Sequence, residues 1–181
     1  MCGIAGIINL KGISRQSLRD MSVALKHRGP DGFGYMVYSE YKGQSIWLNE
    51  ELPSDTASED IVGFAHRRLS IIDLSIASLQ PMVDDTGAYC LVYNGELYNY
   101  IELRTELERL NYSFRTTGDT EAVLYAYKEW GSDCFKKFNG MWAMAILDRR
   151  KKCVVFSRDR FGIKPLYYTF IDNACYFASE I

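Results

Sequence analysis

The sequence predicts an α+β fold in which helices cover two facing antiparallel sheets. Short segments of strand length make up most of the pattern, and convincing helices are few. The run 141–147 is apolar at both odd and even positions, which is typical of a strand covered on both faces. The chain has 181 residues, 48% of them apolar, enough for a core without metal or disulfide staples. We therefore expect one layered domain.

The N-terminal part predicts a strand, a helix and a tight turn. Residues 3–9 are small and apolar over the length of a strand, so we expect the N-terminus to lie within a sheet. Residues 14–26 show helical spacing of apolar side chains, and Ser14 is a suitable N-cap. A turn is expected where this helix ends, because Pro30 is followed by Asp-Gly.

The rest of the chain predicts further strands and two more helices. The segment 49–60 is acidic and is the most linker-like loop. A strand over 89–93 is expected to turn sharply at Asn94-Gly95 and to present backbone N–H groups there. Helices are expected over 98–110 and 120–130, the second ending at Gly131. The remaining strands are expected over 33–38, 45–48, 61–69, 141–147, 154–158, 166–170 and 175–179.

Charge and cysteine content argue against several classes of protein. Twenty-one basic and 23 acidic side chains give a formal net charge of −2, which disfavours binding to nucleic acid or to an anionic membrane. There is no transmembrane-length apolar stretch and no signal peptide, so we expect a cytoplasmic protein. Five cysteines without a C-x-x-C motif argue against a disulfide framework and a cysteine zinc site. We expect four of them to be small core residues: Cys90, Cys134, Cys153 and Cys175.

Cys2 is the first candidate for chemistry. Removal of Met1 would leave a free α-amino group on this cysteine, so that one residue carries both a nucleophile and a base. An α-amine has a pKa of about 7.7–8.0 and a thiol about 8.5, so the neutral amine can accept the thiol proton near neutral pH. Such a nucleophile needs no histidine, and the chain has only His27 and His66. The alternative is an inert small residue in an apolar strand.

Other polar residues each have a functional and a structural interpretation. Asn94 and Gly95 can form an oxyanion hole, in which each donor lowers an acyl-transfer barrier by roughly 3 kcal/mol, or an ordinary β-turn. Of the adjacent Arg67 and Arg68, only one can face a given cavity and bind a carboxylate, and both can instead be solvated charges. Asp119 can pair with an ammonium group or cap a helix. His27 is best explained by a role at a helix C-terminus.

Six blocks of the sequence together resemble a class II glutamine amidotransferase domain, most like the N-terminal half of glutamine-hydrolysing asparagine synthetases. In chain order these blocks are Met1-Cys2-Gly3-Ile4-Ala5-Gly6, His27-Arg28-Gly29-Pro30-Asp31-Gly32, Arg68-Leu69-Ser70-Ile71-Ile72-Asp73, Gln80-Pro81-Met82, Asn94-Gly95-Glu96-Leu97-Tyr98-Asn99 and Thr117-Gly118-Asp119-Thr120-Glu121. The resemblance spans nearly all of residues 1–181 and implies the N-terminal-nucleophile hydrolase fold, a four-layer αββα sandwich of two antiparallel sheets.

The resemblance also implies roles for individual residues. Cys2 matches the family's nucleophile, and Asn94 and Gly95 match its oxyanion donors. The glutamine-binding positions fall on Arg68 for the α-carboxylate, on Asp119 for the α-ammonium group, and on Ile72, Asn94, Gly95 and Glu96. The family's arginine directly precedes Leu-Ser, which selects Arg68 over Arg67.

The implied reaction is hydrolysis of L-glutamine to glutamate and ammonia through a thioester at Cys2. In the family the ammonia passes to a C-terminal synthetase domain that uses ATP and magnesium to form an amide on aspartate or another carboxylate, such as a sugar acid. That domain is absent from residues 1–181, so we predict a truncated piece of a longer protein. We expect no cofactor or metal in this domain, and a homodimer is left open.

Two other functions compete with this interpretation. One is a stand-alone N-terminal-cysteine amidohydrolase, which Arg68 and Asp119 disfavour because a substrate without an amino-acid group would leave both charges unpaired. The other is a catalytically silent interaction domain, which would have no need for all of the matched polar residues.

Overall fold

The computed structural model describes residues 1–54 and 59–181, which fall into two compact units. Unit 1 comprises Met1–Leu69, Leu79–Pro81 and Pro165–Ile181. Unit 2 comprises Ser70–Ser78 and Met82–Lys164. Residues 55–58, part of the predicted loop 49–60, lie outside the described residues.

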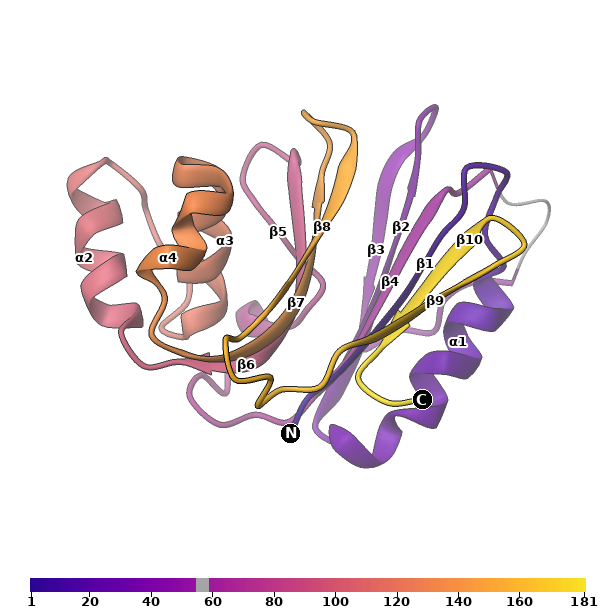
Figure 1. Cartoon of the computed structure of the whole chain (residues 1–181), viewed down its shortest axis with the longest axis horizontal. Helices are drawn as coiled ribbons and strands as arrows, with labels where there is room; N and C mark the ends of the chain where they lie inside the picture. Colours follow the sequence, from indigo (N-terminus) through magenta and orange to yellow (C-terminus); the bar gives the residue numbers. More distant parts are fainter. Residues whose placement is uncertain (55–58) are drawn as a thin grey trace. The chain divides into compact units, whose positions relative to one another are not determined.

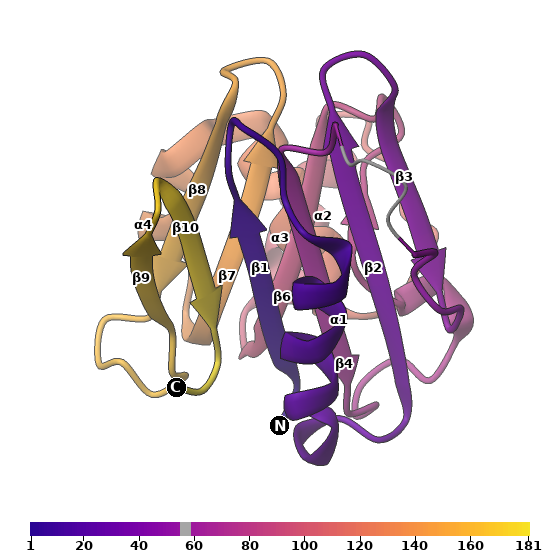
Figure 2. The ribbon, with the colours of Figure 1, turned by 90° about the vertical axis from the view of Figure 1, so that its right-hand side faces the viewer.

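Unit 1 is a six-stranded antiparallel sheet with one helix on one face (Figures 1 and 2). The order β3-β2-β4-β1-β10-β9 places the N-terminal strand β1 between β4 and β10. Helix α1 (Arg15–Ala24) begins as predicted, because the Ser14 side chain accepts a hydrogen bond from the N–H of Ser17 at 3.1 Å. The short helix η1 (Lys26–Arg28) follows. The strands are β1 Gly3–Ile8, β2 Gly32–Ser39, β3 Gly43–Leu48, β4 Val62–Arg68, β9 Tyr167–Ile171 and β10 Ala174–Ala178.

Unit 2 is a four-stranded antiparallel sheet in the order β5-β6-β7-β8, with three α-helices over one face (Figure 1). Every residue of β7 from Trp142 to Asp148 is buried, which confirms the prediction that this strand is covered on both faces. Its strands are β5 Met82–Val83, β6 Tyr89–Leu97, β7 Gly140–Asp148 and β8 Cys153–Arg158. Its helices are η2 Ile76–Ser78, α2 Tyr100–Arg109, α3 Asp119–Trp130, η3 Gly131–Asp133 and α4 Cys134–Lys137.

Two predictions about local structure need correction. The expected sharp turn at Asn94-Gly95 is wrong, because β6 continues through both residues and pairs them with Ala143 and Trp142 of β7. Pairing with a strand about 50 positions later in the sequence overrides the local turn preference of Asn-Gly. Of the four cysteines expected in the core, three are buried and Cys153 is only half-buried.

The α+β class with antiparallel sheets is confirmed. The longest helix in the described part of the chain is α3, with 12 residues, short of the roughly 20 residues that cross a bilayer.

Candidate functional site

Cys2 lies just before β1, and its thiol contacts the chain that leaves β4. The Sγ atom accepts a hydrogen bond from the N–H of Leu69 at 3.3 Å and donates one to the Leu69 carbonyl oxygen at 3.6 Å. Cys2 is half-buried, and Met1 before it is exposed. These two hydrogen bonds have distances that are ordinary for sulfur, and both join the thiol to backbone atoms of Leu69, so they orient the thiol.

The two adjacent arginines at the end of β4 point to opposite faces of the sheet. Arg67 donates from Nε to the carbonyl oxygen and the hydroxyl of Ser22 in α1, at 3.0 and 2.9 Å. Because strand side chains alternate, Arg68 projects from the face opposite α1. Gly3 pairs with Arg67, so the same register carried one step further places Cys2 opposite Arg68. Unit 1 thus brings together the two site residues predicted within it.

Arg28 secures the backbone next to the thiol. Its Nε donates to the Cys2 carbonyl oxygen at 3.0 Å, and its Nη1 donates to Glu180 Oε1 at 2.8 Å. The hydrogen bond from Arg28 has the largest effect on the pKa of Glu180, which it lowers, and the bond from His27 lowers it further. His27 also bonds through Nδ1 to the carbonyl oxygen of Ala24 at 3.1 Å, as expected for a residue at a helix C-terminus. Sequence reasoning assigned no role to Arg28, although one of the matched blocks contains it.

Asn94 is buried on the face of the unit 2 sheet that points away from the helices. The odd-numbered residues Leu91, Tyr93 and Leu97 of β6 pack into the core formed with α2 and α3, so Asn94 projects from the other face. It is only 2% exposed, and its Nδ2 has no hydrogen-bond partner among the described residues. A buried amide donor without a partner is costly in a folded protein, which is why it indicates a ligand-binding group.

The backbone N–H of Gly95 points toward the open edge of β6. The N–H groups of Tyr89 and Leu97 donate away from β7, to Asp84 Oδ1 and to Asp119 Oδ2, both at 2.9 Å. Alternate N–H groups of a strand share one direction, so that of Gly95 does the same. In the described part of the chain β5 pairs with β6 only at Cys90 and Leu91, so near Gly95 this edge has no strand partner.

Close packing on the core-facing side of β6 also requires a glycine at position 95. A Cβ atom at this position would lie 2.4 Å from the Tyr93 ring and 2.6 Å from the Met141 carbonyl oxygen. The Tyr93 ring cannot easily move, because its hydroxyl donates to Asp119 Oδ2 at 2.9 Å. The donor N–H and the buried carboxylate therefore depend on one tyrosine, a residue that the sequence analysis missed. Tyr93 lies two positions before Gly95 on the same strand and therefore shares its face, and this spacing is the signal that could have revealed it.

Asp119 is the first residue of α3 and is buried. The N-cap position belongs to Gly118, so the alternative of a simple helix cap is not observed. Burial raises the pKa of the Asp119 carboxyl, against the hydrogen bonds from Leu97 and Tyr93 that favour its ionised form. A bound cation would offset the unfavourable effect of burial on the ionised carboxylate, so the environment of Asp119 suits an ammonium group.

Ile72 and Glu96 also lie in unit 2. Ile72 is 39% exposed in the segment Ser70–Ser78, and Glu96 is half-buried next to Leu97. The predicted residues therefore form two groups, Cys2 with Arg68 in unit 1 and Ile72, Asn94, Gly95, Glu96 and Asp119 in unit 2.

Glu121 supports the segment that leads into α3. It is fully buried, and its Oε2 accepts hydrogen bonds from the N–H groups of Arg115 and Thr116 and from the Thr116 hydroxyl, at 2.8 to 2.9 Å. Replacing Glu121 by alanine is expected to lower the free energy of unfolding by about 3 kcal/mol, because it removes the carboxylate that these buried donors share. Denaturant unfolding measures this, with Glu129→Ala as the matched control.

Glu129 lies on the same helix, and its carboxylate accepts one bond, from the Tyr112 hydroxyl at 3.0 Å near the surface. The control should therefore cost less than about 1 kcal/mol. Equal destabilisation by the two variants would contradict the supporting role of Glu121.

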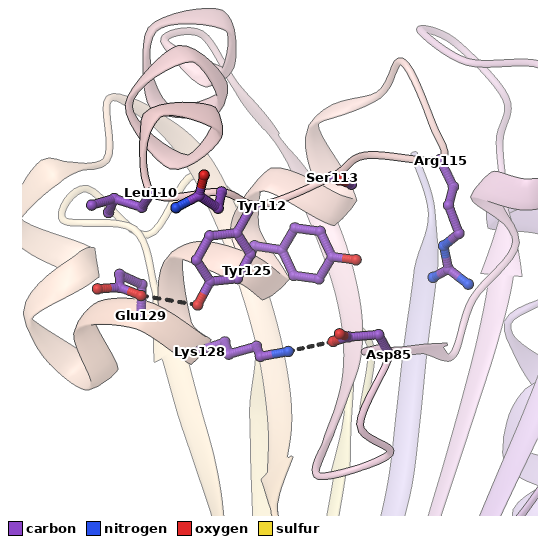
Figure 3. Close-up of a pocket in the computed structure, with 9 residues that line it drawn as sticks. Asp85, Leu110, Tyr112, Ser113, Arg115, Tyr125, Lys128 and Glu129 are labelled. Atoms are coloured by element: carbon purple, nitrogen blue, oxygen red, sulfur yellow. Dashed lines mark hydrogen bonds and ion pairs between the residues drawn. The ribbon is translucent and has the colours of Figure 1, made fainter.

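A pocket in unit 2 has a volume of about 530 Å³ and contains none of the predicted site residues (Figure 3). Its charged groups already have partners within the protein. Lys128 pairs with Asp84 at 2.9 Å and with Asp85, and Glu129 pairs with Tyr112. The pocket is lined by Asp85, Leu110, Asn111, Tyr112, Ser113, Arg115, Tyr125, Lys128 and Glu129. These internal pairs satisfy the charges of Lys128, Asp85 and Glu129.

Residues 53–181 match the family model described as a glutamine amidotransferase domain. The chain belongs to this family. Asparagine synthetase [glutamine-hydrolyzing] 2 of Bacillus subtilis is 40% identical over all of the chain, and asparagine synthetase [glutamine-hydrolyzing] 1 of the same organism is 37% identical over 99% of it. The chain spans 22% and 26% of the length of these two relatives.

The glutamine amidotransferase domain also has a solved structural counterpart. The glutamine phosphoribosylpyrophosphate amidotransferase of B. subtilis superposes with a TM-score of 0.80 at 20% identity, over 98% of this chain and 42% of that one. At such low identity the likeness shows the fold alone. The expected N-terminal-nucleophile fold is confirmed, and the chain is a glutamine amidotransferase domain similar to the corresponding part of glutamine-hydrolysing asparagine synthetases.

Proposed function

We propose that this domain hydrolyses L-glutamine to glutamate and ammonia, with Cys2 as the nucleophile. The observation that carries the proposal is the buried, unpartnered Asn94 Nδ2 among the described residues, next to a Gly95 N–H directed at an open strand edge. Two donors so arranged suit the oxyanion that forms when a thiolate attacks an amide carbonyl.

The charges of the other residues match those of the substrate. Glutamine has one carboxylate and one ammonium group on its α-carbon, and the proposed site supplies Arg68 for the first and Asp119 for the second. Arg68 suits the carboxylate because a guanidinium group binds it through two parallel hydrogen bonds. Ile72 and Glu96 complete the proposed contacts with the substrate.

The reaction proceeds through a thioester. After removal of Met1, the Cys2 α-amine accepts the thiol proton, and the sulfur attacks the side-chain amide of glutamine. Asn94 and Gly95 stabilise the oxyanion, the protonated amine gives its proton to the departing nitrogen, and ammonia leaves. Water then attacks the thioester, releasing glutamate and restoring the thiol. We further propose that the ammonia supplies an ATP- and magnesium-dependent site elsewhere in the full protein, where it forms an amide on aspartate or another carboxylate.

Covalent labelling with a diazoketone analogue of glutamine tests this proposal directly. We expect intact-mass analysis to show the loss of one methionine and then the addition of one analogue less dinitrogen, which leaves when the Cys2 sulfur is alkylated. Free glutamine should protect against the addition, and Cys2→Ala should prevent it. Labelling tests the site even if ammonia release needs the rest of the protein.

Other labelling results would overturn the proposal. Addition at another residue, or at Cys2 at a rate that glutamine does not change, would favour an amidohydrolase with a different substrate. No addition to a chain that has lost Met1 would favour a catalytically silent interaction domain.

A further inference from the structure

The segment Ser70–Ser78 of unit 2 presents apolar side chains to solvent. Ile71, Leu74 and Ile76 are 68%, 75% and 76% exposed. A segment with so little burial is not held in place by the hydrophobic effect. Its conformation must therefore depend on polar contacts.

Asp73 supplies those contacts. Its Oδ1 accepts a hydrogen bond from the N–H of Ser75 at 2.8 Å, which fixes the turn of the segment itself. Its Oδ2 accepts bonds from the N–H of Thr117 at 2.8 Å and from the Thr117 hydroxyl at 3.1 Å. The last two bonds connect the segment to residues 44 positions later in the sequence.

The segment Ser70–Ser78 lies close to the segment that contains Thr117 and Gly118, and the Asp73 carboxyl that joins them is ionised. A Cβ atom on Gly118 would lie 3.3 Å from the Asp73 Cβ, so a larger residue there would push the two segments apart. Burial opposes ionisation of Asp73, but the hydrogen bonds from Ser75 and Thr117 outweigh it and hold the pKa of Asp73 well below its usual range.

We infer that Asp73 is a positioning residue for glutamine binding, which fixes Ile72 and Asp119 relative to each other. Ile72 directly precedes Asp73, and Asp119 follows Thr117 by two residues. One carboxylate therefore ties together the two segments that carry these proposed glutamine contacts. The inference rests on the proposed function, since it assigns the ordered segment to that substrate.

The expected consequence is an effect on binding and not on chemistry. Because Asp73 already holds the two segments together in the free protein, the binding free energy of glutamine is not reduced by the cost of ordering them. Asp73 touches neither the thiol nor the oxyanion donors in any contact described above. Its loss should therefore raise KM for glutamine and leave kcat nearly unchanged.

Three variants remove different parts of the contact between Asp73 and Thr117. Asp73→Ala removes it and is expected to raise KM at least about tenfold, with kcat within about twofold of wild type. Thr117→Val keeps the backbone bond and loses the hydroxyl bond, so KM should rise about threefold. Thr117→Ser keeps both bonds and should behave as wild type. If Asp73→Ala does not fold, the two threonine variants still test the inference.

Two further measurements separate this inference from the proposed function. Limited proteolysis within residues 70–78 should be faster in Asp73→Ala than in wild type. Iodoacetamide, which lacks an amino-acid group, should label Cys2 at the same rate in both. Faster proteolysis with unchanged KM, or a lower kcat with unchanged KM, would overturn the inference while leaving the glutaminase proposal intact. Wild-type protein that glutamine does not protect from the diazoketone would overturn both.

Discussion

Cys2→Ala is expected to lower the release of ammonia from glutamine by at least about 10³-fold, because no other group replaces the attacking sulfur. The fold should survive the change. Cys2 is half-buried, and its two hydrogen bonds to the Leu69 backbone involve a thiol, which is a weak donor and acceptor, so the free energy of unfolding should fall by less than about 1 kcal/mol. An assay of glutamate or ammonia, run beside denaturant unfolding, measures both quantities.

Two controls separate the thiol from the amine. Cys153→Ala alters another half-buried cysteine and should leave activity unchanged. An uncleaved N-terminal extension keeps the Cys2 thiol but converts its α-amine into an amide, so activity should also fall to the level of Cys2→Ala. Full activity in the extended chain would show that a group other than the α-amine accepts the thiol proton.

Asn94→Ala is expected to lower kcat by about 10² to 10³-fold with a smaller change in KM. The donor Nδ2 stabilises charge that develops only in the transition state, so its loss slows the chemical step. The effect should not come from unfolding, because Nδ2 has no hydrogen-bond partner within the described residues and the variant breaks no bond from that atom. Steady-state kinetics over a range of glutamine concentrations gives both constants.

Arg68→Ala provides the contrasting result. Loss of a buried cation that pairs with the substrate carboxylate should act mainly on binding and raise KM by about 100-fold. If Asn94→Ala instead raised KM and Arg68→Ala lowered kcat, the proposed roles of the two residues would be exchanged.

Local sequence predicted most elements because their signals are local. The Ser14 side chain caps α1, Gly131 ends α3, and the apolar run 141–147 is a buried strand. The prediction failed at Asn94-Gly95, where a strong two-residue turn signal lies within a strand. Turn preference is a small energy summed over two residues, whereas pairing with β7 extends along nine residues of β6.

The amino-acid order was enough to identify the chemical groups of this protein: a thiol at position 2, a carboxamide next to a glycine, two adjacent arginines and an acidic residue where a helix was expected to begin. The directions of these groups depend on the three-dimensional fold. In the fold, Arg67 donates to Ser22, and the N–H of Gly95 points to the unpaired edge of β6. Asp119 accepts a hydrogen bond from the Tyr93 hydroxyl, and Asp73 accepts one from Thr117. Side-chain direction depends on strand register and on partners far away in the sequence, so no local pattern could specify it.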